Sequence, residues 1–191
     1  MDIQGWLRIS GGVLALLMYA PLVRQVLRTN GAGQSFAMWA LWAVLDTTLT
    51  LSVFLQHGNF LLPAGFAVGS ILLTLLLLAK GRFSWGRLES VISVLVVVCL
   101  LVWKFSGPEM ATIASTAAIV IAGTPALVEL WRNPQRDLAH VWLGYTAANV
   151  LSCMGAASWS MEDRLVPAIF AVQTLALALI GYRTPVKLRH L

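Results

Sequence analysis

The chain has 191 residues, of which 59% are apolar and 11% are charged, and its formal net charge is +5. With a mean hydropathy of +0.81, it has too few charged side chains to cover a water-facing surface, which excludes a soluble globular domain. Its basic residues form short clusters between apolar runs and no aromatic-interleaved stripe, which argues against nucleic-acid binding. The apolar excess is therefore expected to face lipid.

Seven apolar stretches come close to the length needed to cross roughly 30 Å of hydrocarbon as helices. Short breaks rich in glycine, asparagine and proline separate them, so consecutive helices are expected to run antiparallel. The predicted spans are Leu7 to Val26, Phe36 to Gln56, Leu61 to Ala79, Leu88 to Trp103, Ala111 to Trp131, Ala139 to Trp159 and Leu165 to Tyr182. The first stretch lacks the layout of a signal peptide, and we expect it to be a retained span.

Lysine and arginine are distributed unequally between the two sides of this predicted bundle. One side holds Arg24, Arg28, Lys80, Arg82, Arg87, Arg132, Arg136, Arg183, Lys187 and Arg189. The other side holds Arg8, Lys104 and Arg164. Because cytoplasmic loops retain positive charge, the sequence predicts an amino terminus outside the cytoplasm and a carboxyl terminus inside. The short loops favour a bacterial inner membrane.

An internal repeat relates the two ends of the chain. The string PAGFAVGS at residues 63–70 returns as PAIFAVQT at residues 167–174, with five of eight positions identical. At offsets of 103 or 104 residues, further pairs match across three helices. These pairs are Pro21 with Pro125, Arg28 with Arg132, Trp39 with Trp142, Trp42 with Tyr145, and Asp46 with Asn149.

The repeated unit is three helices long, and the fourth span has no counterpart. An odd number of helices reverses the direction of a second copy, and one added helix restores it, so the two copies are expected to be parallel. The predicted fold is an all-α membrane protein with seven transmembrane helices arranged as 3+1+3. Its expected parts are a first bundle at 1–83, a linker helix at 84–107, and a second bundle with a basic tail at 108–191.

The sequence resembles the SWEET and PQ-loop transporter superfamily over nearly its whole length. The resemblance lies in YAPLVRQVLR at residues 19–28, in GTPALVELWR at residues 123–132, and in the tryptophan-bearing starts of the second and sixth spans. Where the family has a Pro-Gln pair, this chain has Pro21-Leu22 and Pro125-Ala126. The resemblance implies a carrier in which Pro21 and Pro125 act as gate hinges, whereas the sequence alone equally allows static kinks.

Asp46 is the sharpest clue to chemistry, because it falls at the middle of the second predicted span. An ionised carboxylate at this depth costs about 2.5–3.5 kcal/mol, and no lysine or arginine lies at comparable depth to offset that cost. Three interpretations are open: a carboxyl that carries a proton during transport, a binding group for a cationic solute, and an acceptor for hydroxyls in a wet cavity. A structural alternative is a protonated carboxyl tied to Thr47 or Ser70.

Aromatic residues share the helix face of Asp46. Trp39, Trp42 and Asp46 are spaced i, i+3, i+7, and so are Trp142, Tyr145 and Asn149, so each trio occupies one face. Repeat symmetry would turn the two faces toward each other, with the aromatic rings stacking on a sugar or contacting a cation. Interface anchoring is the alternative role for these tryptophans. The remaining expected site residues are Ser70, Gln173 and Thr174, which would otherwise be close helix contacts.

These observations predict a transporter of a small polar metabolite, such as a sugar, amino acid or vitamin-like solute, that works by alternating access around a midplane site. Transport would be passive or linked to protons, which are then a second expected partner beside the solute and the bilayer. The alternative function is a membrane receptor that binds a ligand in the same cleft without transporting it. We expect no enzyme activity, no metal and no cofactor, because Cys99, Cys153 and the histidines form no ligand cluster and no nucleophile has a base beside it.

Overall fold

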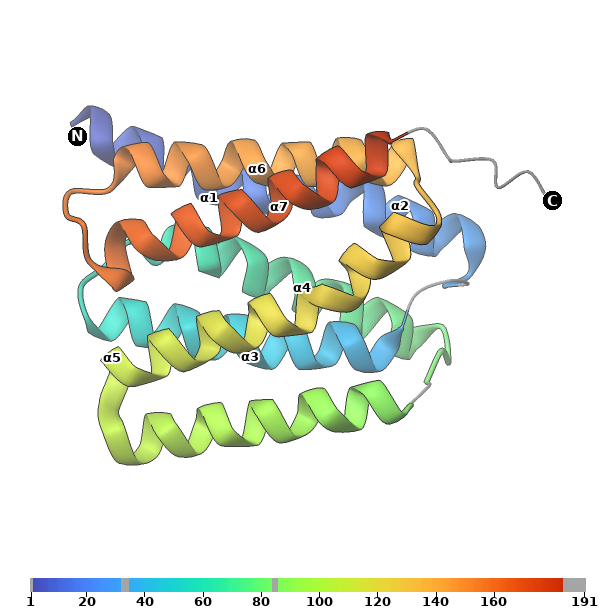
Figure 1. Cartoon of the computed structure of the whole chain (residues 1–191), viewed down its shortest axis with the longest axis horizontal. Coiled ribbons are helices and arrows are strands. Elements are labelled where there is room, and N and C mark those ends of the chain that lie inside the picture. The colour runs from blue at the N-terminus through green and yellow to red at the C-terminus, as the bar shows by residue number, and fades with distance from the viewer. Residues whose placement is uncertain (1, 32–34, 84–85, 184–191) are drawn as a thin grey trace, which may run out of the picture.

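The computed structural model describes residues 2–31, 35–83 and 86–183, apart from the side chains at 87–89, 92, 125 and 129. Within these ranges all regular secondary structure is helical. Figure 1 shows the helices lying alongside one another, and apart from α1 and α2, which continue in one direction, consecutive long helices run in opposite directions. The all-helical fold class is therefore confirmed.

The first span consists of two helices joined at a bend. Helix α1 is Ile3–Leu17 and helix α2 is Tyr19–Thr29, with Met18 between them. Pro21 has no N–H to donate to the Leu17 carbonyl, and its ring crowds that carbonyl. The break just before the proline therefore follows directly from the sequence.

Helices α3 and α4 form an antiparallel hairpin. Helix α3 is Phe36–Leu55 and begins after Ser35, whose hydroxyl accepts a hydrogen bond of 3.2 Å from the Met38 N–H. Helix α4 is Leu61–Ala79. At 1.5 Å per residue α3 is about 30 Å long, which matches the hydrocarbon core and places Asp46 at its middle.

Helix α5, Arg87–Arg132, is broken at Gly107. Gly107 has φ 81° and ψ −177°, a combination that essentially only glycine adopts. Figure 1 shows the chain reversing direction here, so α5 consists of a first arm, residues 87–106, and an antiparallel second arm, residues 108–132. The arms cover the stretches predicted as the fourth and fifth spans.

Helix α6 is Arg136–Gly155, and a π-helical turn η1 at Met161–Leu165 leads into helix α7, Val166–Tyr182. The predicted sixth span, Ala139–Trp159, begins and ends later in the sequence than helix α6. Polar residues at the start of a helix can lie outside the hydrocarbon, so a prediction based on hydropathy does not include them in the span. As a result the middle of α6 lies near Tyr145.

Helix packing follows the same order twice. In the first half of the molecule, α1 to α4, helix α4 packs against both α1 and α3. In the second half, which comprises the second arm of α5 with α6, η1 and α7, helix α7 packs against both α5 and α6. The halves meet where α1 packs on α6 and α3 packs on α5, so equivalent helices form both contacts.

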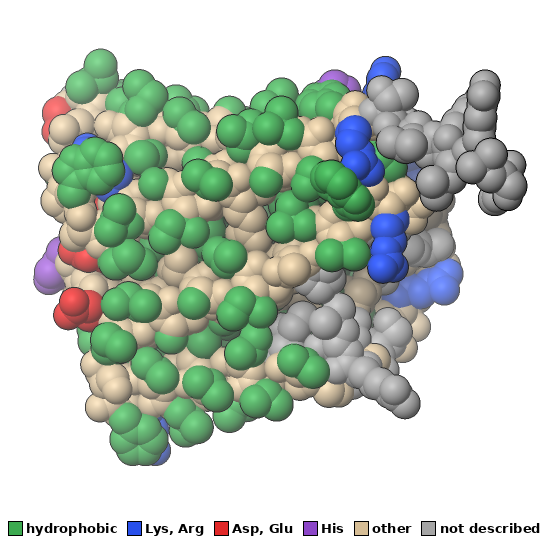
Figure 2. Space-filling view, viewed as in Figure 1, with side chains coloured by type: hydrophobic (Ala, Val, Ile, Leu, Met, Phe, Trp, Pro, Cys, Tyr) green, Lys and Arg blue, Asp and Glu red, His purple; other side chains and the backbone are tan. Residues whose placement is uncertain are grey.

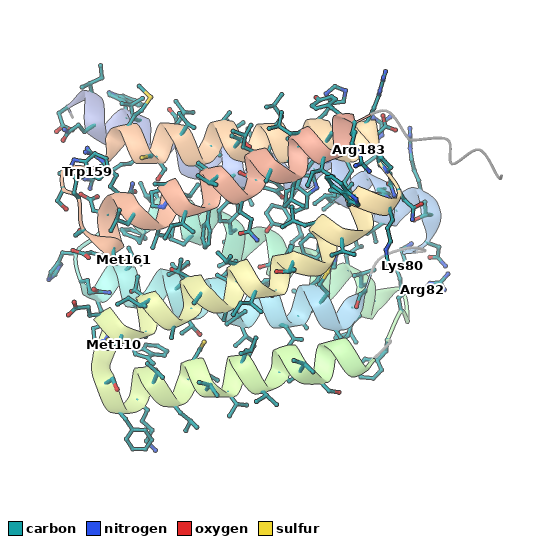
Figure 3. The ribbon with its side chains drawn as sticks, in the orientation of Figure 1. Lys80, Arg82, Met110, Trp159, Met161 and Arg183 are labelled. Carbon is teal, nitrogen blue, oxygen red and sulfur yellow. The ribbon has the colours of Figure 1, made fainter. Side chains whose placement is uncertain are left out.

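The outer surface of the bundle is apolar along the helices and charged at the ends. Val172, for example, is 71% exposed, and large exposed apolar side chains lie on every long helix. Figure 2 shows most of the visible lysine and arginine side chains at one end and the aspartate and glutamate side chains at the other. In Figure 3, Lys80, Arg82 and Arg183 mark the first end, called the basic end below, and Trp159 marks the opposite end, called the acidic end.

Five segments of the described chain are long and apolar enough to cross a membrane. They are Ile3–Thr29, Phe36–Leu55, Leu61–Ala79, Ser93–Arg132 and Met161–Tyr182. The protein therefore has the character of an integral membrane protein. The number differs from the seven predicted spans because the two arms of α5 form one segment by this criterion, and because α6, which carries polar residues such as Asp137 and Asn149, is not included.

Candidate functional site

A cavity of about 70 Å³ lies between the two halves, near the middle of the helices. Its walls come from α2, α3, α4, the second arm of α5, α6 and α7. The lining residues are Tyr19, Trp39, Trp42, Asp46, Phe66, Ile119, Gly123, Trp142, Tyr145, Phe170, Gln173, Thr174 and Leu177. One buried water needs about 10–15 Å³ of such cavity space, so the cavity has room for a few water-sized groups.

Asp46 is the charged residue of this cavity. Its side chain is 95% buried, and Oδ2 accepts a hydrogen bond of 3.2 Å from the Ser70 hydroxyl of α4. The one ion pair found among the described residues joins Arg8 to Asp163. No described lysine or arginine therefore lies within 4 Å of Asp46. A single neutral donor does not offset the desolvation of a carboxylate at mid-membrane depth.

Aromatic rings form most of the wall around Asp46. The ring centroids of Trp39 and Trp42 are 5.3 Å apart, and the ring planes meet at 87°. Tyr19 lies edge-on to Trp39 at 5.9 Å and to Tyr145 at 5.6 Å, which links the two halves through an aromatic contact. Trp142 is 5.7 Å from Tyr145 on the same helix. These tilted and edge-on arrangements are the favourable ones for aromatic pairs.

Two buried hydrogen-bond donors of the cavity wall have no partner among the described residues. They are the indole N–H groups of Trp42 and Trp142. Buried polar groups are nearly always hydrogen-bonded, so donors of this kind on a cavity wall indicate an acceptor inside the cavity.

Repeat-equivalent positions line the cavity from both halves. Trp39 and Trp142, and Trp42 and Tyr145, face it as pairs at an offset of 103 residues, and Phe66 and Phe170, and Tyr19 and Gly123, do so at 104 residues. Residues that are equivalent in the sequence repeat therefore line the cavity from both halves.

The same helix contact occurs in both halves, but the glycine and the large side chain are on opposite helices in the two halves. A Cβ atom at Gly69 would lie 2.1 Å from the ring of Tyr19, so this glycine makes room for the tyrosine. A Cβ atom at Gly123 would lie 2.1 Å from the side-chain nitrogen of Gln173. Tyr19 is equivalent to Gly123, and Gly69 is equivalent to Gln173, at 104 residues. The first half thus contributes a phenol to the cavity where the second contributes an amide.

Seven of the nine residues expected in the substrate site line this cavity. They are Trp39, Trp42, Asp46, Trp142, Tyr145, Gln173 and Thr174. Ser70 lies behind the wall as the donor to Asp46. Thr174 and Thr146 are hydrogen-bonded at 3.1 Å, which ties α7 to α6 at the cavity.

Asn149 does not occupy the position that the sequence predicted. It is fully buried, it is absent from the cavity lining, and its amide donates to the Tyr145 carbonyl of its own helix at 2.8 Å. Helix α6 begins at Arg136, so Asn149 lies past the middle of the helix toward the acidic end. Asp46 therefore has no repeat-equivalent polar side chain facing it in the cavity, and the amide that lines the cavity is that of Gln173.

The two expected hinge residues lie on different helices. The exposed side chain of Pro21 lies on α2 just after the bend at Met18. Pro125 lies within the second arm of α5, and its side chain is outside the described residues.

Sequence reasoning missed several residues of the wall, chiefly Tyr19, Phe66 and Phe170. For the two phenylalanines the sequence carries a signal, because Phe66 and Phe170 occupy the same position in the repeated strings. That signal does not separate a cavity residue from a packing residue, which is the more common role of an apolar ring in a membrane span.

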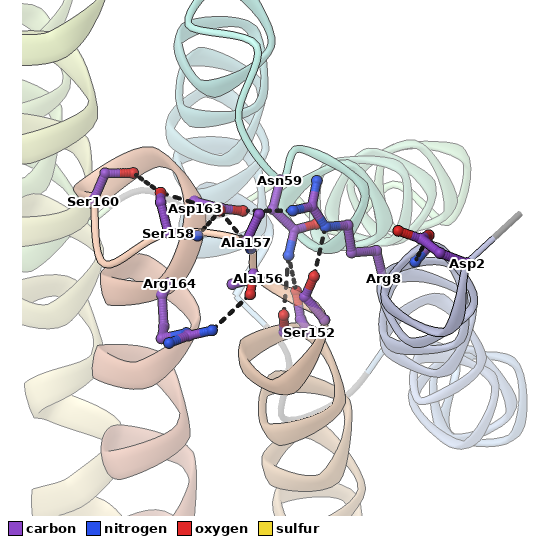
Figure 4. Close-up of polar contacts among 12 residues, drawn as sticks. Asp2, Arg8, Asn59, Ser152, Ala156, Ala157, Ser158, Ser160, Asp163 and Arg164 are labelled. Atoms are coloured by element: carbon purple, nitrogen blue, oxygen red, sulfur yellow. Dashed lines mark hydrogen bonds and ion pairs between the residues drawn. The ribbon is translucent and has the colours of Figure 1, made fainter.

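A polar network joins the two halves at the acidic end (Figure 4). The Arg8 side chain pairs with Asp163 at 3.1 Å and donates to the Gly155 carbonyl at 2.8 Å. The Asn59 amide donates to the Ser152 hydroxyl at 2.9 Å and to its carbonyl at 3.0 Å. Both donors belong to the first half and all acceptors to the second, so this network holds the halves together.

Two polar contacts at the basic end each lie within one half. Arg82 donates to the Asn30 carbonyl at 2.8 Å, and both belong to the first half. Arg183 donates to the Trp131 carbonyl, and both belong to the second half. These two arginine contacts therefore differ from the Arg8 and Asn59 contacts at the acidic end, which join the halves.

The described residues contain no cluster of three or more histidine, cysteine, aspartate or glutamate side chains that could hold a metal ion. A scan against protein-family models, a search of curated proteins and a search of solved structures found no significant match to this chain.

Proposed function

We propose that the protein is a membrane carrier for a small polar metabolite, working by alternating access between its two halves. The observation that carries this proposal is the cavity itself, which lies midway along the helices, between repeat-equivalent walls, and contains a buried carboxylate with no described lysine or arginine within 4 Å. Intramembrane carboxylates of this kind mark solute and proton pathways.

The proposed topology has seven spans in the order 3+1+3. Counting the arms of α5 separately and including α6 gives the seven, and the repeated packing order supports two parallel three-helix bundles with the first arm of α5 as linker. The positive-inside rule places the basic end in the cytoplasm and the acidic end outside, in our proposal in a bacterial inner membrane.

In the proposed mechanism, the first half rocks against the second. In this proposal the Arg8–Asp163 pair and the Asn59–Ser152 bonds hold the acidic end closed, and the bend at Met18 is the hinge about which α2 moves relative to α6 at the basic end. Release of the acidic-end network on closure at the basic end would expose the cavity to the other side. Asp46 binds the solute or exchanges a proton during this cycle.

Uptake into proteoliposomes tests the proposal, using a panel of sugars, amino acids, vitamins and organic cations, with and without a pH gradient. We expect at least one solute to be taken up by the parent protein, and Asp46→Asn to reduce that uptake at least tenfold. Ser52→Ala is the matched control, since Ser52 is fully buried on the same helix but lies off the cavity. Saturable binding without uptake would assign the receptor function instead, and normal uptake by Asp46→Asn would remove Asp46 from the mechanism.

A further inference from the structure

We propose that the solute of this cavity is a small organic cation that also carries a hydrogen-bond acceptor, such as a quaternary ammonium alcohol. The inference rests on the proposed function of the cavity as a solute site and names the chemical class of the solute. Three independent features of the cavity wall support it.

The first feature is charge. Asp46 lines the cavity, is 95% buried and has no described lysine or arginine within 4 Å. Ser70 supplies one neutral hydrogen bond to it. A solute that brings a positive charge into the cavity supplies the missing counter-charge, whereas with a neutral solute the carboxyl group must take up a proton or stay uncompensated in a medium of low dielectric constant.

The second feature is the aromatic wall. Tyr19, Trp39, Trp42, Trp142 and Tyr145 surround the space beside the carboxylate, with neighbouring ring centroids 5.3–5.9 Å apart. Aromatic faces attract cations through the ring quadrupole, tryptophan most strongly, and cages of such rings recognise quaternary ammonium groups. A carboxylate beside an aromatic cage combines long-range attraction with a fitted, weakly hydrated contact surface.

The polar side chains of the wall argue against a sugar. Gln173 donates its amide to the Val120 carbonyl at 3.2 Å, and the Thr174 hydroxyl donates to the Phe170 carbonyl at 2.7 Å. Both are thus already engaged with the backbone. A sugar would bury many hydroxyls against a mainly aromatic wall, and each unpaired hydroxyl would weaken binding.

The third feature accounts for the acceptor. Trp42 and Trp142 each present a buried indole N–H without a partner among the described residues. A cation without an oxygen or comparable acceptor leaves these donors unpaired, whereas a hydroxyl or ether oxygen on the solute accepts from at least one of them. The wall therefore selects for a positive group at Asp46 and an acceptor on the side of the two indoles.

Three probes that differ in one property at a time test the inference on the full-length protein in nanodiscs. Choline is the parent probe. Its neutral isostere, in which carbon replaces the ammonium nitrogen, keeps the shape and removes the charge. Tetramethylammonium keeps the charge and removes the oxygen. We expect choline to bind at least tenfold more tightly than the neutral isostere and more tightly than tetramethylammonium, measured by calorimetry and by the change in tryptophan fluorescence.

Variants then assign the preference to residues. Asp46→Asn is expected to bring choline and its neutral isostere to similar affinity, and Trp42→Leu to weaken choline more than Trp42→Phe does. Ser52→Ala should leave all three affinities unchanged. Comparing the probes on the parent protein keeps the inference testable if a variant fails to fold.

The outcomes separate this inference from the proposed function. Equal binding of choline and its neutral isostere, or failure of both charged probes to bind, overturns the inference. If a neutral sugar or amino acid is still taken up in that case, the carrier function stands. Tight and selective choline binding without any uptake would support the solute class and overturn the carrier function.

Discussion

At the scale of single residues, the shape of the cavity depends on two contacts between a glycine and a larger side chain, one in each half. Gly69 accepts the ring of Tyr19 in the first half, and Gly123 accepts the side chain of Gln173 in the second. Because the four residues occupy two equivalent positions, a repeat built from similar strings carries different polar groups on its two sides. Asymmetry of this kind lets one solute bind in a single orientation.

We expect Gly69→Ala to destabilise the protein by about 1–3 kcal/mol, the usual effect of overpacking. The added methyl group would lie 2.1 Å from the Tyr19 ring, so the ring must move. Thermal unfolding in detergent measures the loss. The double variant Gly69→Ala with Tyr19→Ala should recover part of the stability relative to the sum of the single variants. Strict additivity would show that the two side chains do not meet.

At the scale of elements, the helices end where the backbone chemistry of single residues ends them. Pro21 places the bend between α1 and α2, and Gly107 turns the two arms of α5 antiparallel. The sequence predicted a kink at Pro21 and a break between the fourth and fifth spans, because proline and glycine act locally. The boundaries of α6 were predicted less well, since Arg136 and Asp137 extend the helix beyond the apolar stretch.

Gly107→Ala should cost about 1–3 kcal/mol of stability through backbone strain. A Cβ atom at Gly107 has no neighbour within 4 Å, so crowding makes no contribution. Gly81→Ala is the matched control, because Gly81 also has open space but a φ of 66°, in the left-handed region where side chains are tolerated at lower cost. Chemical unfolding of both variants should show the larger loss for Gly107→Ala, and an equal loss would contradict the assignment of strain to this turn.

At the scale of the whole molecule, polar contacts at the acidic end join the two halves. The Arg8–Asp163 pair is the ion pair of the described chain, and it crosses between the halves. Arg164, close to it in space, donates instead to the Ala156 carbonyl within the second half. The two arginines therefore provide a comparison between a contact that joins the halves and one that does not.

We expect Arg8→Gln to raise access to the cavity from the acidic end. A cysteine at Phe170, a cavity residue near that end, reports access through its labelling rate with a membrane-impermeant maleimide, in a background with Cys99 and Cys153 replaced by serine. The rate should rise at least threefold in Arg8→Gln, whereas Arg164→Gln should leave it unchanged. An equal rise in both variants would indicate general loosening of the acidic end, and no rise would exclude Arg8 as part of the closure.

The helical class, the approximate positions of the long apolar segments, the ends that carry charge and the repeated residue strings could all be predicted from the sequence. Hydropathy, charge and backbone restrictions are properties of short segments, so they can be read without knowing which helices touch. The same local reasoning placed Asp46 at the middle of α3 and identified seven of the residues that line the cavity.

Which side chains meet could not be predicted from short segments, because it depends on how the helices pack. Asn149 lies outside the cavity, Tyr19 lines it, and Arg8 pairs with Asp163 across a sequence separation of more than a hundred residues. These outcomes depend on how far one helix slides along another, and a shift of one helical turn, about 5.4 Å, replaces one set of facing residues by the next. Small residues such as Gly69 set that offset through close packing, and their effect is not visible until both helices are in place.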